Sequence, residues 1–177
     1  FIDNKNVLLI SSNMDIKHTG IILNTLQYHN TIIDGELLLL NKTHIFMAFD
    51  ILYLKNKDMR EFKSLPHRIL LLGEFMNECF NMNINNNDSK LTNVSEIMNF
   101  HSKSIDNYID NLKQVINTKN TFIVWMKYYI FPKGIENNEI FKYSKIIWDK
   151  FTNININFPY KLDGLIYTPL NREYSTQ

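Results

Sequence analysis

Two adjacent apolar runs, residues 31–40 (TIIDGELLLL) and 44–54 (HIFMAFDILYL), constrain the fold more than any other feature of the sequence. Both are dense in β-branched and aromatic residues, which favour extended backbone. Asn41 and Lys42, which separate the runs, predict a short turn. The two runs are therefore expected to form an antiparallel hairpin, and residues 7–11 predict another strand.

Helical signals follow the hairpin. Ser64 is a candidate N-cap, and Pro66 suits the first turn of a helix. One apolar face is expected on this helix, made of Leu65, Ile69, Leu72, Met76 and Phe80. A second amphipathic helix is indicated by Ile105, Ile109, Leu112 and Ile116, and a third is predicted over Glu139–Phe151.

Two more apolar runs predict strands: residues 121–131 (TFIVWMKYYIF), ended by Pro132, and residues 162–168, ended by Pro169. The Asn-rich stretch 81–90 is expected to be a polar loop. Because hairpins outnumber crossovers in this order of elements, we expect an α+β fold with antiparallel sheets flanked by helices, rather than a doubly wound fold.

Charge and composition exclude some classes of protein. Lys plus Arg number 19 and Asp plus Glu 18, so no overall field attracts a polyanion and any nucleic-acid contact must be local. The apolar runs are too short to span a membrane, and the single cysteine suits a reducing compartment. The 25 Asn, with many Ile and Lys, indicate A/T-rich codons, which are common in large DNA viruses and some parasites.

Four short motifs could carry chemistry. Asp34 and Glu36 flank Gly35 in an apolar strand, where the glycine leaves room for a ligand or another backbone, although a surface bulge has the same pattern. Phe49 could belong to the core or stack on a base, and Asp50 beside it needs a partner if it is buried.

Lys127 interrupts an aromatic strand, from which it could extend into solvent or donate to a base carbonyl. Asp163 precedes Gly164, and this pair is either an ordinary turn or a site where the carboxylate offers a hard oxygen ligand to Mg²⁺. Zinc-ligand spacing, a phosphate-binding glycine loop and a Ser/His/Asp arrangement are all missing from the sequence.

The order of these motifs resembles that of the covalent nucleotidyltransferases, in particular the guanylyltransferase of mRNA-capping enzymes. IIDGELLL resembles the family's motif III, FMAFDILYL its motif IIIa, and DGLIYTP its motif IV. The resemblance covers essentially the whole chain and is greatest to the enzymes of large DNA viruses. It implies a nucleotidyltransferase fold of the kind found in ligases and capping enzymes.

The same resemblance assigns the KLDG quartet at Lys161 to motif IV, although a Lys-x-Asp-Gly quartet is also what the family's nucleophile carries. In the family that nucleophilic motif I precedes the DGE strand, so the lysine is expected before Phe1. Motif V and an OB-fold domain are expected after Tyr174. Residues 1–177 would then be a partial nucleotidyltransferase domain, incomplete at both ends.

The resemblance implies that a lysine attacks GTP, forms lysyl-GMP and passes GMP to the 5′-diphosphate end of RNA. Glu36 would hold the ribose or metal-bound waters, and Phe49 would stack on guanine. Asp163 would bind Mg²⁺ or Mn²⁺, and Lys127 would donate to the guanine carbonyl. Glu36 and Asp163 are thus the expected catalytic residues.

Partners would include a methyltransferase or activating subunit, and the expected location is the cytoplasm, a viral factory or the virion.

Two alternatives stay open. An ATP-dependent polynucleotide ligase shares the fold and the lysine chemistry, although ligases usually have Glu-Gly where this chain has Asp163-Gly164. A catalytically inactive nucleotidyltransferase-fold subunit would also lack motif I. One departure bears on activity: related enzymes often have Asp-Arg after the first strand, where this chain has Ser11-Ser12.

Overall fold

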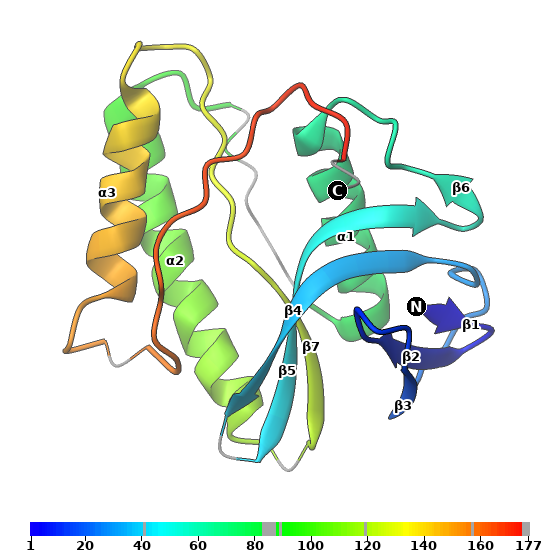
Figure 1. The fold of residues 1–177 in the computed structure, drawn as a ribbon. Helices are drawn as coiled ribbons and strands as arrows, with labels where there is room; N and C mark the ends of the chain where they lie inside the picture. The colour runs from blue at the N-terminus through cyan, green and yellow to red at the C-terminus, as the bar shows by residue number, and fades with distance from the viewer. Residues whose placement is uncertain (41, 83–87, 89, 119, 157, 175–177) are drawn as a thin grey trace. The chain divides into compact units, whose positions relative to one another are not determined.

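The computed structural model describes residues 1–40, 42–82, 88, 90–118, 120–156 and 158–174 (Figure 1). The chain divides into two compact units. The first comprises Phe1–Asn83, Asn120–Lys127 and Thr168–Gln177, and the second comprises Ile84–Lys119 and Tyr128–Tyr167. Within the described ranges, no helix has the length and apolar character that crossing a membrane requires.

The first unit is built on two sheets. A small antiparallel sheet contains β1 (Ile2–Asp3), β2 (Asn6–Ile10) and β3 (Ile16–Ile22), of which only β2 was predicted. In the larger sheet, β4 (Ile32–Leu40) pairs antiparallel with β5 (Thr43–Leu54), which confirms the predicted hairpin. Lys42 lies in the turn at a positive φ of 73°, and Asn41 is outside the described residues.

The other edge of β5 is shared by two strands. β6 (Lys57–Asp58) pairs with its end, and β7 (Phe122–Met126) runs parallel to its first half. This parallel pair corrects the expectation of purely antiparallel sheets, because the chain leaves β5 and returns to it by way of the second unit.

The prediction of a strand over residues 121–131 is also wrong beyond Met126, where β7 ends. The last β7 pair is Ala48 with Met126, and the ladder register of β5 shifts at Phe49, the next residue of β5. A bulge there interrupts the regular edge that a longer β7 would need.

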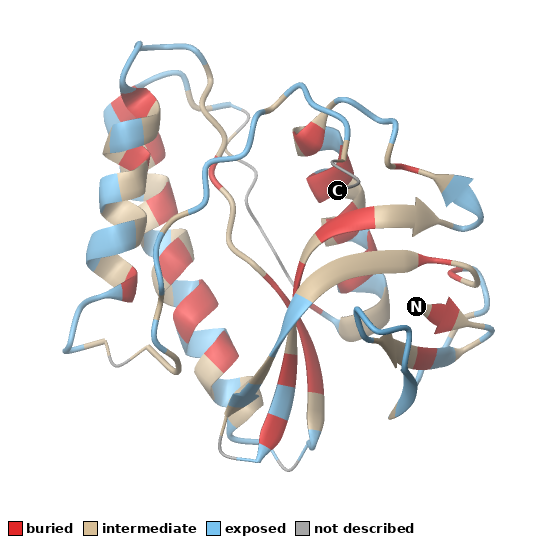
Figure 2. Cartoon of the chain, in the orientation of Figure 1, coloured by how far each residue is buried: buried red, intermediate tan, exposed pale blue. Residues whose placement is uncertain are grey.

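One helix covers the larger sheet. α1 (Leu65–Phe80) begins at the predicted N-cap, where the Ser64 side chain accepts a hydrogen bond from the His67 amide. Its expected apolar face is buried apart from Phe80, which is half-buried, and it packs against β5 and β7 (Figure 2). The core of this unit contains Ile45, Met47 and Ile51 of β5 with Leu72, Phe75 and Met76 of α1.

The second unit is helical. α2 (Val94–Ile116) begins well before the predicted Ile105, whereas α3 (Glu139–Phe151) has the predicted bounds. Val94, Ile97, Ile130 and Tyr143 form a buried cluster, against which Tyr128 packs. Residues 83–87 and 89 of the expected polar loop are outside the described residues.

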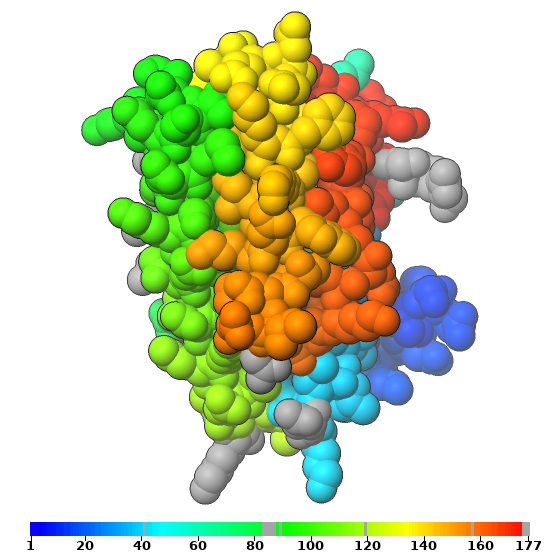
Figure 3. Space-filling model, turned by 90° about the vertical axis from the view of Figure 1, so that its left-hand side faces the viewer, coloured from blue at the N-terminus to red at the C-terminus, as the bar shows by residue number. Residues whose placement is uncertain are grey.

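The strand expected over residues 162–168 does not form, because none of the strands in the described part of the chain pairs with this apolar run. Ile166 is 82% exposed, and Tyr167 contacts α3: its hydroxyl donates to Ser144 Oγ at 2.8 Å, and its ring lies 6.3 Å from that of Phe141. Figure 3 shows this face of the second unit, where α3 lies beside the segment that follows it.

Candidate functional site

Three of the four residues singled out from the sequence lie together in the first unit. Lys127 directly follows β7, and its backbone amide donates to the Ala48 carbonyl at 2.8 Å, which fixes it beside β5. Its Nζ lies 2.9 Å from Oε2 of Glu36 on β4 and 5.3 Å from the ring centroid of Phe49 on β5. Since β5 lies between β4 and β7, the lysine side chain reaches across the sheet over Phe49.

This group of three residues, called here the Glu36–Phe49–Lys127 cluster, is open to solvent. The Lys127 side chain is 24% exposed and that of Glu36 is 45% exposed. An ion pair with this exposure contributes about 0.2–1 kcal/mol, so it rearranges at small cost. The ammonium carries three N–H donors. An anion or a carbonyl oxygen could therefore bind Lys127 while one donor stays on Glu36.

Gly35 allows close contact between two strands of the sheet. A Cβ at Gly35 would lie 2.6 Å from two ring atoms of Phe46 and 2.7 Å from the Met47 carbonyl oxygen. Both neighbours belong to β5, so the close approach expected at this glycine is made by the adjacent strand. Packing between β4 and β5 is enough to explain why the DGE motif has a glycine at this position.

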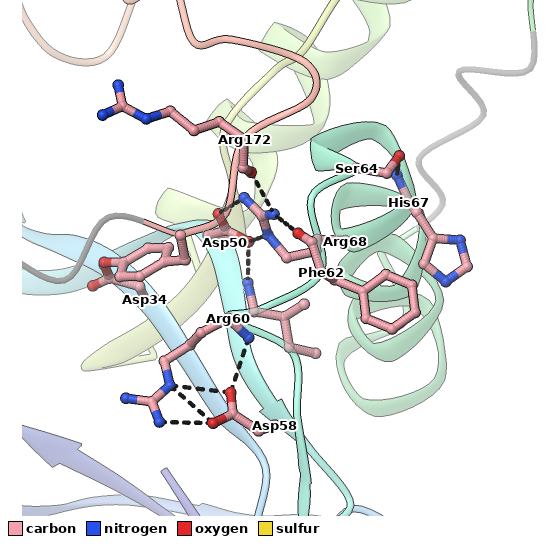
Figure 4. Close-up of polar contacts among 11 residues, drawn as sticks. Asp34, Asp50, Asp58, Arg60, Phe62, Ser64, His67, Arg68 and Arg172 are labelled. Atoms are coloured by element: carbon pink, nitrogen blue, oxygen red, sulfur yellow. Dashed lines mark hydrogen bonds and ion pairs between the residues drawn. The ribbon is translucent and has the colours of Figure 1, made fainter.

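Asp50 is buried and has the charged partner that a buried carboxylate needs. The sequence analysis above did not identify this partner. Arg68 of α1 meets Asp50 with two hydrogen bonds, from Nε to Oδ1 and from Nη2 to Oδ2, both at 2.9 Å (Figure 4). The signal was present: Arg68 is three residues after Leu65 and four before Leu72, so it lies in the apolar stripe of the helix. An arginine there needs a buried acid.

Asp34, the other acid that flanks Gly35, has a different partner from Glu36. The Tyr174 hydroxyl donates a hydrogen bond to Asp34. Burial and this hydrogen bond raise the pKa of the Tyr174 phenol, so the group stays protonated and remains a donor. Tyr174 was not predicted, because nothing local in NREY indicates a contact with a strand so distant in sequence.

Asp163 belongs to the second unit, and its metal role stays a prediction. Asp163 is exposed, and so is Lys161, two positions earlier. A single exposed carboxylate suits Mg²⁺, which binds one or two protein carboxylates together with water and substrate phosphates. The described ranges contain no group of three or more His, Cys, Asp or Glu placed to hold a metal ion.

One curated protein with significant similarity is named "Probable mRNA-capping enzyme" and comes from Acanthamoeba polyphaga mimivirus. It is 33% identical to this chain over 177 residues, an alignment that covers 97% of the chain and 15% of that protein. No family model and no solved structure matches the chain. The resemblance to a viral capping enzyme, inferred above from the order of the motifs, is confirmed.

Proposed function

We propose that this chain is part of the guanylyltransferase of an mRNA-capping enzyme and has the nucleotidyltransferase fold. The observation that carries the proposal is the Glu36–Phe49–Lys127 cluster, which groups residues from motifs III and IIIa with a lysine far along the chain. The similarity to a protein named as a probable capping enzyme supports it. The chain spans 15% of the length of that protein.

In this proposal the cluster binds the nucleoside of GTP. The Lys127 ammonium over the Phe49 ring is a cation–π contact worth about 0.5–1 kcal/mol at an exposed site. A base stacked on the same ring gains about 1–3 kcal/mol. Stacking is therefore favourable even if the ammonium must move to the edge of the base, where it can donate to the guanine carbonyl. Glu36 can then accept from the ribose hydroxyls.

The lysine also gives a reason for GTP over ATP. Guanine presents a carbonyl acceptor at the position where adenine presents an amino donor, and an ammonium has donors only. A lysine at that edge would favour guanine. This distinguishes the proposal from the ligase alternative, which needs adenine to be preferred.

When bound, Mg²⁺ would offset the charge of the phosphates, with Asp163 as the expected ligand. The nucleophilic lysine is expected N-terminal to the DGE strand, from the family's order of motifs. The acceptor would be the 5′-diphosphate end of RNA.

The test is an adduct map on the full-length protein. Incubation with Mg²⁺ and labelled GTP or ATP, followed by peptide mass spectrometry, should find GMP on a lysine N-terminal to Glu36. Lys127→Met should lower the ratio of GMP to AMP adducts about tenfold, since an interaction of about 1–2 kcal/mol is lost.

Lys145→Met is the matched control. Lys145 also pairs with an exposed carboxylate, that of Asp149, but lies on α3 of the second unit. It should leave the ratio unchanged. AMP as the main adduct of the parent protein would move it to the ligases, and an absence of adduct with either nucleotide would favour the inactive subunit.

A further inference from the structure

Residues 55–63 (KNKDMREFK) carry a local excess of positive charge. Four of them are Lys or Arg and two are acids, against 19 and 18 in the whole chain, so acids outnumber basic residues elsewhere. Arg60 binds both carboxylate oxygens of Asp58, which leaves the three lysines opposed within the segment only by Glu61. The local basic patch that a nucleic-acid contact requires is therefore present here.

Two aromatic rings stack on each other at the end of this segment. The rings of Phe62 and His67 are close to parallel, with an interplanar angle of 18° and 5.2 Å between their centroids. Both residues are exposed, and Figure 4 shows the two rings beside each other. The ammonium of Lys57, on β6, lies over the Phe62 ring, 5.3 Å from its centroid. These three residues are called here the Lys57–Phe62–His67 platform.

Backbone contacts hold both rings of the platform in place. The Phe62 amide donates to the Met59 carbonyl at 3.0 Å, and the Phe62 carbonyl accepts from the guanidinium of Arg68. Arg68 is itself buried and fixed by its ion pair with β5. The His67 amide donates to the side chain of Ser64, the N-cap of α1. The platform is therefore preformed, and a ligand would bind it at little cost in conformational entropy.

Exposed aromatic rings beside ammonium groups are the features that bind single-stranded nucleic acid. Bases stack on the rings, and lysines contact the phosphates that join the bases. Lys57 supplies one such cation, and Lys63, the residue after Phe62, supplies another. The Lys63 side chain is 74% exposed, and its Nζ lies 3.6 Å from the Glu173 carboxylate. A phosphate could replace so exposed an ion pair at small cost.

Ordinary surface packing explains the platform poorly. A single exposed aromatic residue needs no explanation, because such residues are common on protein surfaces. Three features coincide here: two stacked rings that stay exposed, a cation over one of them and a local excess of positive charge. An acidic protein segment would match the charge but would leave the stacked rings without a role. A single-stranded polynucleotide has both planar bases and phosphates, so it matches all three features.

On these grounds we infer that the platform binds single-stranded RNA, and that this RNA is the acceptor of GMP. The identity of the strand rests on the proposed function, whereas the binding depends on the platform alone. In the transfer, a terminal phosphate oxygen of the RNA bonds to the phosphorus of GMP. The P–N bond to the lysine breaks, and the lysine nitrogen takes up a proton from water. The platform would hold the RNA for this step and has no part in forming lysyl-GMP, which needs no RNA.

The experiment measures RNA binding and GMP transfer with the full-length protein. The probe is a short, unstructured 5′-diphosphate RNA with a fluorophore at its 3′ end, followed by anisotropy. Phe62→Ala should weaken its binding about tenfold and raise the KM for RNA in GMP transfer by a similar factor, because one stacked base is lost. Phe62→Tyr keeps the ring and should bind as the parent protein does. Lys57→Met should lower the slope of log affinity against log salt by about 0.7, the share of one phosphate contact.

Matched controls come from exposed residues outside the platform. Phe141→Ala removes an exposed ring on α3 of the second unit, and Lys17→Met removes an exposed lysine on β3 of the small sheet. Both should leave the affinity for RNA and the salt slope unchanged. Formation of lysyl-GMP from GTP alone, without RNA, reports whether each variant is folded.

The outcomes separate this inference from the proposed function. A folded Phe62→Ala protein with the parent's affinity and KM for RNA would overturn the inference. If Phe62→Ala does not fold, a Lys57→Met protein with the parent's salt slope would do the same. Polyphosphate has no bases, so if it bound as tightly as RNA, the surface would recognise charge alone, as an acidic protein partner requires, and the inference would fail.

The proposed function can fail independently of the platform. A parent protein that forms no lysyl-GMP but binds RNA through Phe62 would refute the guanylyltransferase and leave a binding site for single-stranded RNA. Lysyl-GMP formation together with RNA binding that ignores Phe62 would support the guanylyltransferase and refute the platform.

Discussion

Replacing Gly35 with alanine tests how the DGE strand is held. The new Cβ would lie 2.6 Å from the Phe46 ring and 2.7 Å from the Met47 carbonyl oxygen. The ring is the far end of a side chain and can move, whereas the carbonyl belongs to the ladder between β4 and β5 and has little freedom. Overpacking of this kind costs about 1–3 kcal/mol.

Alanine also lowers the conformational entropy of the unfolded chain, which by itself raises the free energy of unfolding by about 0.4–1 kcal/mol. The net loss in the free energy of unfolding should therefore be about 1–2 kcal/mol, measured by urea denaturation. Gly73→Ala is the matched control in α1, where a Cβ meets nothing within 4 Å. It should stabilise the same unit by about 0.5–1 kcal/mol, because alanine is the better helix former.

A double-mutant cycle identifies the neighbour responsible. Phe46→Ala removes the ring and leaves the Met47 carbonyl, so the cost of Gly35→Ala should fall in that background without disappearing. Adduct formation should decline with Gly35→Ala beyond the loss of folded protein, since Glu36 is the next residue. A Gly35→Ala protein as stable as the parent, or a cost unaffected by Phe46→Ala, would refute the reasoning.

Two further predictions concern a helix cap and a buried histidine. Ser64→Ala should lower the free energy of unfolding by about 0.5 kcal/mol, since its cap bond is long at 3.4 Å, whereas Asn93→Ala, with a cap bond of 2.8 Å, should cost about 1 kcal/mol. Equal losses in urea denaturation would contradict the link to bond length. Burial lowers the pKa of His101 below its ordinary 6.5 despite the Asp88 carboxylate, so the unfolded chain takes up a proton that the folded chain does not. Stability should therefore fall as pH drops below 6.5, and His101→Gln should reduce that slope; identical slopes in urea midpoints from about pH 7 to 5 would show the idea to be wrong.

The sequence determined the elements whose signals are local. The β4–β5 hairpin follows from two apolar runs and a short turn, and α3 has the bounds predicted from the sequence. Ser64 marks the start of α1, because capping depends on residues within one turn. The order of DGE, FD and DGLIYTP motifs also indicated the family that the capping-enzyme similarity supports.

Only the tertiary structure decided the features that depend on distant residues. Residues 162–168 have the composition of a strand but pair with no strand among the described residues. β7 ends at Met126 because the neighbouring β5 bulges at Phe49. Arg68 and Tyr174 acquire their roles from Asp50 and Asp34, far away in sequence. A strand needs a partner and a buried charge needs a counter-charge, and which residue supplies either is set by how the chain folds back on itself.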